Sequence, residues 1–209
     1  FPMIIYDGML KYANFSPDIL QNIENGIGLQ LQDVEDEERK EGGFLAIDLI
    51  DYIYAVLHSV TYRDTYHDFL QNDFPTIPYP ASAEYFFKMA EFGKRLRYLH
   101  ELKGIDRKDL ITTYPVIGEK DNNVVLIHKF EETNEGIGRV WINKEQYFDG
   151  VPLEAWNMII AGYQPLEKWL KDRKDKHLTS DEIIHYQKMV VALVKTIRTQ
   201  EKIDEIIEL

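Results

Sequence analysis

The residue types that most often carry catalysis are few in this sequence, and their spacing matches no known catalytic pattern. The 209 residues include six histidines and no cysteine, and no two histidines form an HxH or HExxH pair. Metal and acid–base sites need such groups at suitable spacing. We therefore expect surface or partly buried histidines, and a metal site assembled from distant His, Asp and Glu residues stays open as an alternative. The histidines are His58, His67, His100, His128, His177 and His185.

Loops that bind phosphates or cofactors are also missing from the sequence. ENGIGLQ and NEGIGRV each contain GxG, but neither continues as GxGxxG, and no GxxxxGKS, GxxxxGKT or GxSxG occurs. The Glu-x-Lys of EERK resembles the end of nuclease motifs, but it lies in a polar stretch. The Asp/Asn-Pro-Pro-Tyr motif of amino-methylating enzymes is absent. The sequence predicts a domain with neither a catalytic centre nor a cofactor of its own.

Reading a DNA sequence requires side chains that present paired donors or acceptors to base edges. RVWINKEQYFDG, residues 139–150, offers such groups among aromatic residues. The alternative is ordinary strand polarity, with Trp141, Tyr147 and Phe148 in the core. The candidate DNA-binding residues of this region are Arg139, Asn143, Lys144 and Gln146.

The second candidate region is GYQPLEKWLKDRK, residues 162–174, the most basic part of the chain. If Pro165 begins a helix, Leu166, Trp169 and Leu170 share its apolar face, and most of the cations lie away from that face. Cations near a helix C-terminus also complement the helix dipole, so an amphipathic helix explains part of the pattern without DNA. We expect Trp169 in the core rather than stacked on a base. The candidate DNA-binding residues here are Lys168, Lys171, Arg173, Lys174 and Lys176.

The elements that must position these residues are mainly helical. MIIYDG predicts a short strand with an Asp-Gly turn, and FSPDILQNIENG predicts a helix that begins at Pro17 and ends at Asn25-Gly26. A long helical pattern follows Gly43 and has a break near Ser59. FPTIPYP, residues 74–80, is expected to be a rigid extended connector on the surface of the core.

After a further helix that ends before Gly104, the pattern changes to strand periodicity. NVVLIHKF and GRVWINKEQYF each predict a strand, and EETNEGI joins them as a hairpin. Helices return at Pro152, Pro165 and Thr179, where Thr179 and Glu182 form a capping box. The predicted fold is α+β, mainly helical with a small antiparallel sheet in the second half. We expect one domain over residues 1–209, with a possible subdivision near residues 110–123.

The charge balance limits the partners. The formal net charge is -12, and residues 1–110 carry 11 basic and 19 acidic side chains against 13 and 17 in residues 111–209. Taken alone, this charge argues against an independent nucleic-acid binder. No apolar run approaches the ~20 residues that a membrane span needs. The absence of cysteine fits a reducing cytoplasm, and a chain that opens on Phe without a signal peptide is expected to be part of a longer polypeptide.

Three stretches together indicate one family. They are DYIYAVLHSVTYRDTYHDFLQNDFPTIPYP, GRVWINKEQYFDGVPLEAWNMIIAGYQPLEKWLKDRK and LTSDEIIHYQKMVVALVKTIR, residues 51–80, 138–174 and 178–198. In this order they resemble the C-terminal specificity domain of type ISP and type IIG restriction-modification enzymes, which fuse adenine-specific DNA methyltransferases to nuclease modules. The resemblance spans nearly the whole chain.

The resemblance implies a target recognition domain that binds double-stranded DNA and the methyltransferase core of the same polypeptide. S-adenosylmethionine would bind to that core, so no cofactor is expected in this chain. The acidic balance implies weak DNA binding by this segment alone. Two alternatives stay open: a protein-interaction or coupling module that does not read bases, and an enzyme with a split metal site. Tyr62, Arg63 and Tyr66 are expected either at the junction with the core or in contact with DNA.

Overall fold

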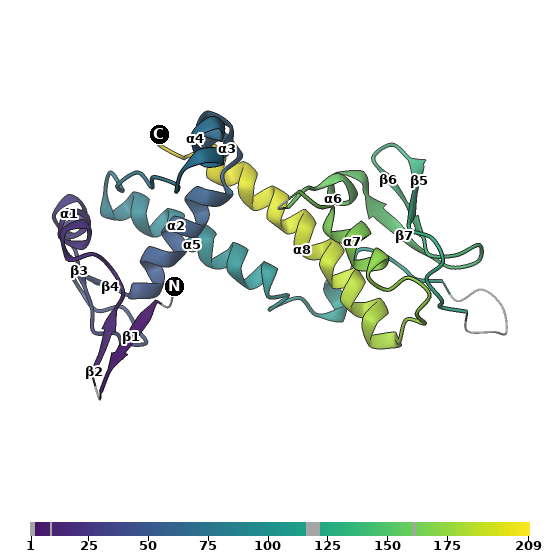
Figure 1. The fold of residues 1–209 in the computed structure, drawn as a ribbon, viewed down its shortest axis with the longest axis horizontal. Helices are drawn as coiled ribbons and strands as arrows, with labels where there is room; N and C mark the ends of the chain where they lie inside the picture. Colours follow the sequence, from purple (N-terminus) through teal and green to yellow (C-terminus); the bar gives the residue numbers. More distant parts are fainter. Residues whose placement is uncertain (1–2, 9, 116–121, 161) are drawn as a thin grey trace. The chain divides into compact units, whose positions relative to one another are not determined.

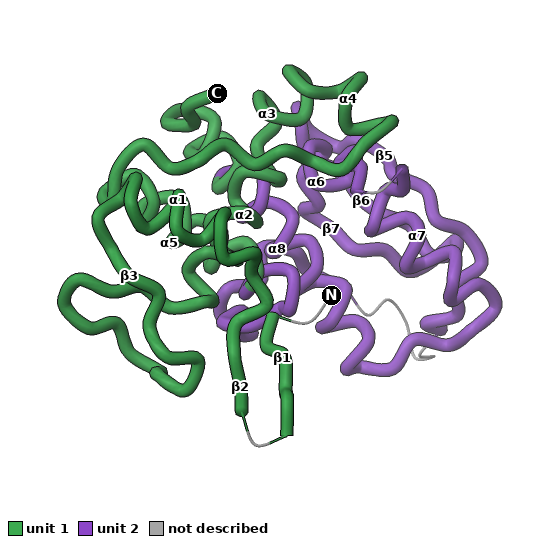
Figure 2. The backbone as a smooth tube through the Cα atoms, turned by 60° about the vertical axis from the view of Figure 1, so that its left-hand side comes forward, with its two compact units in different colours: residues 1–97, 199–209 green, residues 98–198 purple. Residues whose placement is uncertain are grey.

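The computed structural model describes residues 3–8, 10–115, 122–160 and 162–209, and within them the chain has the predicted α+β fold (Figure 1). The residues cluster into two compact units, shown in different colours in Figure 2. Unit 1 comprises residues 1–97 and 199–209, and unit 2 comprises residues 98–198. The predicted subdivision near residues 110–123 lies within unit 2, falls partly on residues 116–121 outside the described part, and stays a prediction.

Unit 1 opens with a hairpin and a helix. Strands β1 (Ile4–Asp7) and β2 (Leu10–Ala13) pair antiparallel, and Gly8 in the connecting turn has a φ of 61°. Helix α1 (Pro17–Ile27) begins at Pro17 as predicted, but it ends later than Asn25-Gly26. It stops where Gly28 takes the left-handed conformation (φ 71°) and its N–H binds the Glu24 carbonyl. Glycine adopts that conformation without steric cost, so the later glycine ends the helix.

The first half also contains a short strand pair that the sequence did not predict, followed by the predicted helices. Strands β3 (Gln30–Leu31) and β4 (Gly43–Phe44) form a short parallel pair. Helices α2 (Ala46–His58), α3 (Val60–Thr65) and α4 (His67–Asn72) follow. The break near Ser59 is confirmed, because the Ser59 hydroxyl accepts the Tyr62 N–H at 2.9 Å and donates to Asp204 Oδ1 at 2.5 Å.

The core of unit 1 forms where α2 packs on α5 (Ala83–His100), around Phe44, Tyr52 and Phe86. The two helices approach closely, since a Cβ on Gly93 would lie 1.7 Å from the Asp51 carbonyl oxygen. The proline-rich connector lies against this core, as predicted. Its carbonyls at Pro78 and Thr76 accept the hydroxyls of Tyr52 and Tyr62, both at 2.9 Å.

Unit 2 contains the predicted hairpin within a three-stranded antiparallel sheet, ordered β5 (Lys129–Asn134), β6 (Ile137–Trp141) and β7 (Tyr147–Pro152). The strand predictions were wrong in two places. Residues 123–128 are not a strand of this sheet. Val124 makes an isolated bridge with His177, and the N–H groups of Leu126 and Ile127 bind the Ile142 carbonyl at 2.6 and 2.9 Å. GRVWINKEQYF forms two strands instead of one, because a tight turn at residues 142–146 reverses the chain.

The helices of unit 2 begin where the sequence predicted. Pro152 precedes α6 (Leu153–Asn157), and Pro165 is the first residue of α7 (Pro165–Lys171). A 3-10 turn, η1 (Arg107–Asp109), lies earlier in the chain. Helix α8 (Ser180–Asp204) follows the Thr179 capping box. Its residues Tyr186, Val190 and Leu193 are buried against side chains of the sheet and of α7. None of the helices in the described ranges is long and apolar enough to cross a membrane.

Candidate nucleic-acid interface

Helix α7 turns a buried face inward and a charged face outward. Leu166 and Leu170 are fully buried in the core of unit 2. Lys168 and Lys171 are exposed on the other side. This division confirms the amphipathic helix that the 3–4 spacing of apolar residues predicts.

The turn after α7 is held in place by backbone hydrogen bonds to residues 123–125. The N–H of Asp175 binds the Val125 carbonyl at 2.8 Å, and the N–H of Val125 binds the Lys176 carbonyl at 3.0 Å. Asp175 adopts a left-handed conformation with a φ of 62°. The backbone that carries Lys174 and Lys176 is therefore fixed at this point, while both side chains are exposed.

The lysines of α7 already have acidic partners. Lys168 Nζ lies 2.8 Å from Asp172, and Lys171 Nζ lies 2.9 Å from Glu167. Exposed pairs at this spacing contribute only a few tenths of a kcal/mol to stability. Between residues 167 and 176, five basic and three acidic side chains give a net charge of 5 − 3 = +2. The region is positive, but less so than its lysines alone suggest.

Arg173 has a structural role beside Trp169. Its guanidinium lies 3.5 Å from the centre of the Trp169 ring, and its Nε donates to Glu182 at 3.0 Å. Trp169 is half-buried and packs against the core, with the His185 ring stacked at 5.7 Å, as expected of a scaffold residue. Glu182 also accepts the Thr179 N–H, and this bond, followed by Arg173, lowers the pKa of Glu182.

Two of the predicted cations near α7 lack a carboxylate partner in the described part of the chain. Lys174 is exposed and makes no ion pair there, and Lys176 donates only to the Asp172 carbonyl at 3.3 Å. An exposed ammonium group of this kind can meet a phosphate without first breaking a salt bridge. Lys174 and Lys176 are thus the most accessible cations near α7.

The sheet region contributes two exposed or half-exposed cations. Arg139 on β6 pairs with Asp149 at 3.1 Å, and its guanidinium lies 4.5 Å from the centre of the Tyr147 ring. Lys144 in the following turn is exposed and has no ion pair with a described residue. Both stay predicted DNA contacts.

Asn143 and Gln146 are buried, which corrects their selection as base-contacting residues. Their exposed fractions are 2% and 0%. The Asn143 amide donates to the carbonyls of Asn122 and Val124 and accepts the N–H groups of Glu145 and Gln146, so it forms the turn between β6 and β7. An Asn followed by polar residues after a strand is a turn signal, and that signal could have identified this role.

The other motifs considered in the sequence have structural roles where they are described. Arg39 of EERK pairs with Asp48 at 2.7 Å, and Lys40 pairs with Asp36 at 2.6 Å. Gly28 ends α1, and Gly136 occupies the β5–β6 turn with a φ of 72°. Among the described residues, no group of three His, Cys, Asp or Glu side chains could hold a metal ion.

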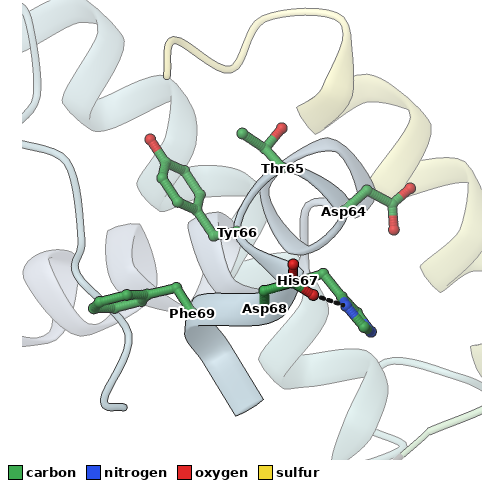
Figure 3. A pocket seen from close by; sticks show the side chains of 6 residues that line it. All are labelled: Asp64, Thr65, Tyr66, His67, Asp68 and Phe69. Carbon is green, nitrogen blue, oxygen red and sulfur yellow. Dashed lines mark hydrogen bonds and ion pairs between the residues drawn. The ribbon is translucent and has the colours of Figure 1, made fainter. Parts of the chain in front are cut away.

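A surface hollow of about 630 Å³ lies beside α3 and α4 in unit 1 and is drawn in Figure 3. It is lined by Asp64 and Asp68, together with Tyr66, His67 and Phe69, and His67 lies 3.1 Å from Asp68. Two carboxylates repel phosphate groups, so this hollow does not suit a nucleic-acid backbone. The nearby Tyr62 is buried in the core, and Arg63 donates to the Ser59 carbonyl at 3.2 Å.

One feature beside α7 was missed in the sequence. Ile159 and Tyr163 lie in the connection between α6 and α7 and are 64% and 60% exposed. They border a hollow of about 470 Å³ that Lys168 and Lys171 also line. The sequence signal was a group of apolar residues around a glycine between two proline-started helices.

Several solved structures resemble this chain, including the following three. A DrdV–DNA complex matches with a TM-score of 0.67 and 18% identity over 99% of this chain and 21% of that chain. The ATP-dependent Type ISP restriction-modification enzyme LlaBIII bound to DNA matches with a TM-score of 0.60 and 19% identity. The match covers 96% of this chain and 12% of that chain. A nuclease-deletion mutant of the Type ISP restriction-modification enzyme LlaGI with a DNA substrate mimic matches with a TM-score of 0.50 and 21% identity. The match covers 83% of this chain and 14% of that chain.

These likenesses concern the fold, because the identities are low. This chain spans about a fifth or less of each of the three chains. No curated protein matches it. The sequence model of the Type ISP C-terminal specificity domain matches residues 1–209. The chain therefore belongs to the family of Type ISP C-terminal specificity domains.

Proposed function

We propose that this chain reads a short base sequence in double-stranded DNA, and that other domains of the same polypeptide methylate an adenine and cleave the DNA. The observation that carries the proposal is family membership over residues 1–209, together with relatives of the same fold whose structures contain DNA. S-adenosylmethionine would bind to the methyltransferase core and not to this chain. The chain supplies specificity, and the chemistry occurs elsewhere.

In this proposal Lys174 and Lys176 contact phosphates first, because neither has to leave a carboxylate of a described residue. Lys168 and Lys171 exchange Asp172 and Glu167 for phosphate groups as DNA approaches. Phosphate contacts of this kind fix the orientation of the protein on the duplex, while base contacts select the sequence. Lys144 and Arg139 are proposed as further contacts.

An exchange of this domain between two full-length proteins of the family tests the proposal. The two parents should recognise different sequences, and residues 1–209 of this chain should replace the equivalent part of the other parent. We expect the methylated sequence to follow the exchanged domain, which sequencing of methylated genomic DNA measures. A chimera that is active but keeps the sequence of its recipient would contradict the proposal.

A protein-interaction or coupling module is the second candidate function, and the net charge of -12 and the paired lysines favour it. The substitutions Lys174→Glu and Lys176→Glu in the full-length protein separate the two. If the chain contacts DNA, the slope of log affinity against log salt falls by about 0.9 for each lost phosphate contact. The control is Arg107→Glu with Lys108→Glu in η1, because these two cations are also exposed and the change in charge is the same. The coupling module predicts an unchanged slope in both variants.

A further inference from the structure

In the connection between α6 and α7, Ile160 and Tyr163 are joined by two backbone hydrogen bonds. The N–H of Ile160 binds the Tyr163 carbonyl at 2.8 Å, and the N–H of Tyr163 binds the Ile160 carbonyl at 3.0 Å. Gly162 has a φ of 82°, which favours glycine. Pro165 then begins α7 at once. Both ends of the turn are therefore anchored by helices of unit 2.

This turn exposes three large apolar side chains, and we call Ile159, Ile160 and Tyr163 the apolar turn. Their exposed fractions are 64%, 40% and 60%. Single exposed apolar residues are common, but a group of three at one tip marks a contact site. Three side chains are too few for the core of a stable protein interface, which buries roughly 800 Å² on each partner.

Two lysines, each paired with a carboxylate, lie beside the apolar turn. Lys168 Nζ lies 5.8 Å from the centre of the Tyr163 ring, and Lys168 and Lys171 line the same hollow of about 470 Å³ together with their partners Asp172 and Glu167. Lys174 and Lys176 follow in the turn after α7. An aromatic face and aliphatic tips beside several ammonium groups match a nucleic-acid base next to its phosphates.

We infer that the apolar turn inserts at a base step of the bound duplex, with Tyr163 stacked on a base and Lys168 and Lys171 on the flanking phosphates. This inference rests on the proposed function. The inserted turn would make binding depend on how easily the DNA is deformed at that step. Apolar side chains inserted between bases unstack that step, and the cost depends on the sequence. The apolar turn thereby contributes to specificity without hydrogen bonds to base edges.

The test uses the full-length protein and the duplex that it selects from a random-sequence pool. Two variants, Tyr163→Ala and Ile159→Ser with Ile160→Ser, should each bind this duplex about tenfold more weakly, as expected for the loss of one stacked base. Their affinity for an unrelated duplex should stay within about twofold, since phosphate contacts dominate there. Tyr163→Phe should bind as the wild type does, and Ile111→Ser is the control at another exposed apolar residue of unit 2.

The unstacked step itself is detected by 2-aminopurine fluorescence at each adenine and permanganate reactivity at each thymine. We expect at least one position whose signal rises with the wild type and Tyr163→Phe but not with Tyr163→Ala. Unchanged affinity and signals in Tyr163→Ala would overturn the inference, and so would an equal loss of affinity for both duplexes. Lower thermal stability with unchanged DNA binding would instead place the apolar turn against protein, and this result also overturns it.

These outcomes separate the inference from the proposed function. If the exchanged domain transfers the recognised sequence while Tyr163→Ala changes nothing, only the insertion is wrong. If the exchanged domain does not transfer the sequence, the proposed function is wrong, whatever the apolar turn contacts.

Discussion

Each lysine on the outer face of α7 has a carboxylate one helical turn away, and these pairs lower the attraction of the helix for phosphate. Substituting Glu167→Gln and Asp172→Asn releases Lys171 and Lys168 and removes two negative charges. At ~0.5 kcal/mol for each pair, we expect DNA affinity to rise about fivefold at low salt. Fluorescence anisotropy at two salt concentrations measures the change, which should shrink as salt screens it.

The matched control removes two exposed carboxylates in unit 1, by Glu37→Gln with Glu205→Gln. It changes the net charge by the same amount without releasing a lysine of α7. An equal rise in affinity in both double variants would show that total charge, and not the local pairs, sets the affinity.

Asn143 shows why residue type alone was insufficient to select base contacts. Its amide makes four hydrogen bonds to the backbone around the β6–β7 turn. We expect Asn143→Ala to lower the free energy of unfolding by about 1–3 kcal/mol, because buried backbone groups lose their partner. Urea denaturation measures this loss. Lys144→Ala, at the exposed neighbouring position, should stay within about 0.5 kcal/mol of the wild type.

At the scale of elements, the approach of α2 to α5 depends on one glycine. A methyl group on Gly93 would lie 1.7 Å from the Asp51 carbonyl oxygen, so the helices would have to separate. We expect Gly93→Ala to destabilise unit 1 by at least about 1–3 kcal/mol. Thermal or urea unfolding checks this value.

Gly26 in α1 provides the opposite case. A Cβ there meets no atom within 4 Å, so Gly26→Ala should stabilise the helix by about 0.5–1 kcal/mol. If Gly93→Ala stabilised the protein as Gly26→Ala should, the approach of α2 to α5 would not depend on the missing side chain at Gly93.

The helices could be predicted from sequence because their signals are local. Pro17, Pro165, Ser59 and Thr179 mark helix starts through their own backbone and side-chain chemistry. The strands could not be delimited in the same way. NVVLIHKF has strand composition, yet residues 123–125 form hydrogen bonds with the turn after α7. These partners lie about 50 residues away in the sequence.

The candidate site was only partly predictable for the same reason. The spacing of Leu166 and Leu170 shows which face of α7 is buried, and so it places the lysines outside. Whether a lysine has a carboxylate partner, or whether Asn143 faces inward, depends on contacts between distant segments. The apolar turn was missed because the adjacent residues in the sequence do not determine whether an isoleucine side chain is exposed.

At the scale of the whole molecule, stability should fall in mild acid. Burial, and to a lesser extent Arg63, lowers the pKa of His58, whose Nδ1 donates to the Tyr54 carbonyl at 2.8 Å. The unfolded chain therefore takes up a proton more readily at this site. The contribution of neutral His58 to the free energy of unfolding is fully present above about pH 6.5, and it is lost as the pH falls below that value.

We expect His58→Asn to flatten part of the pH dependence of unfolding between about pH 5 and 7. The change is partial, because burial and Arg173 also lower the pKa of His185, and Glu182 loses its stabilising charge at lower pH still. Urea unfolding at several pH values measures the slope.

The carboxylates beside the lysines of α7 have a consequence for the search of a genome. Every position on chromosomal DNA offers the same phosphates, so a strongly cationic face would hold the protein at millions of irrelevant positions. A face with a net charge of +2 on a chain of net charge -12 gains little from phosphates alone. Under the proposed function, the protein would spend little time at wrong positions, and its occupancy would be decided by the bases.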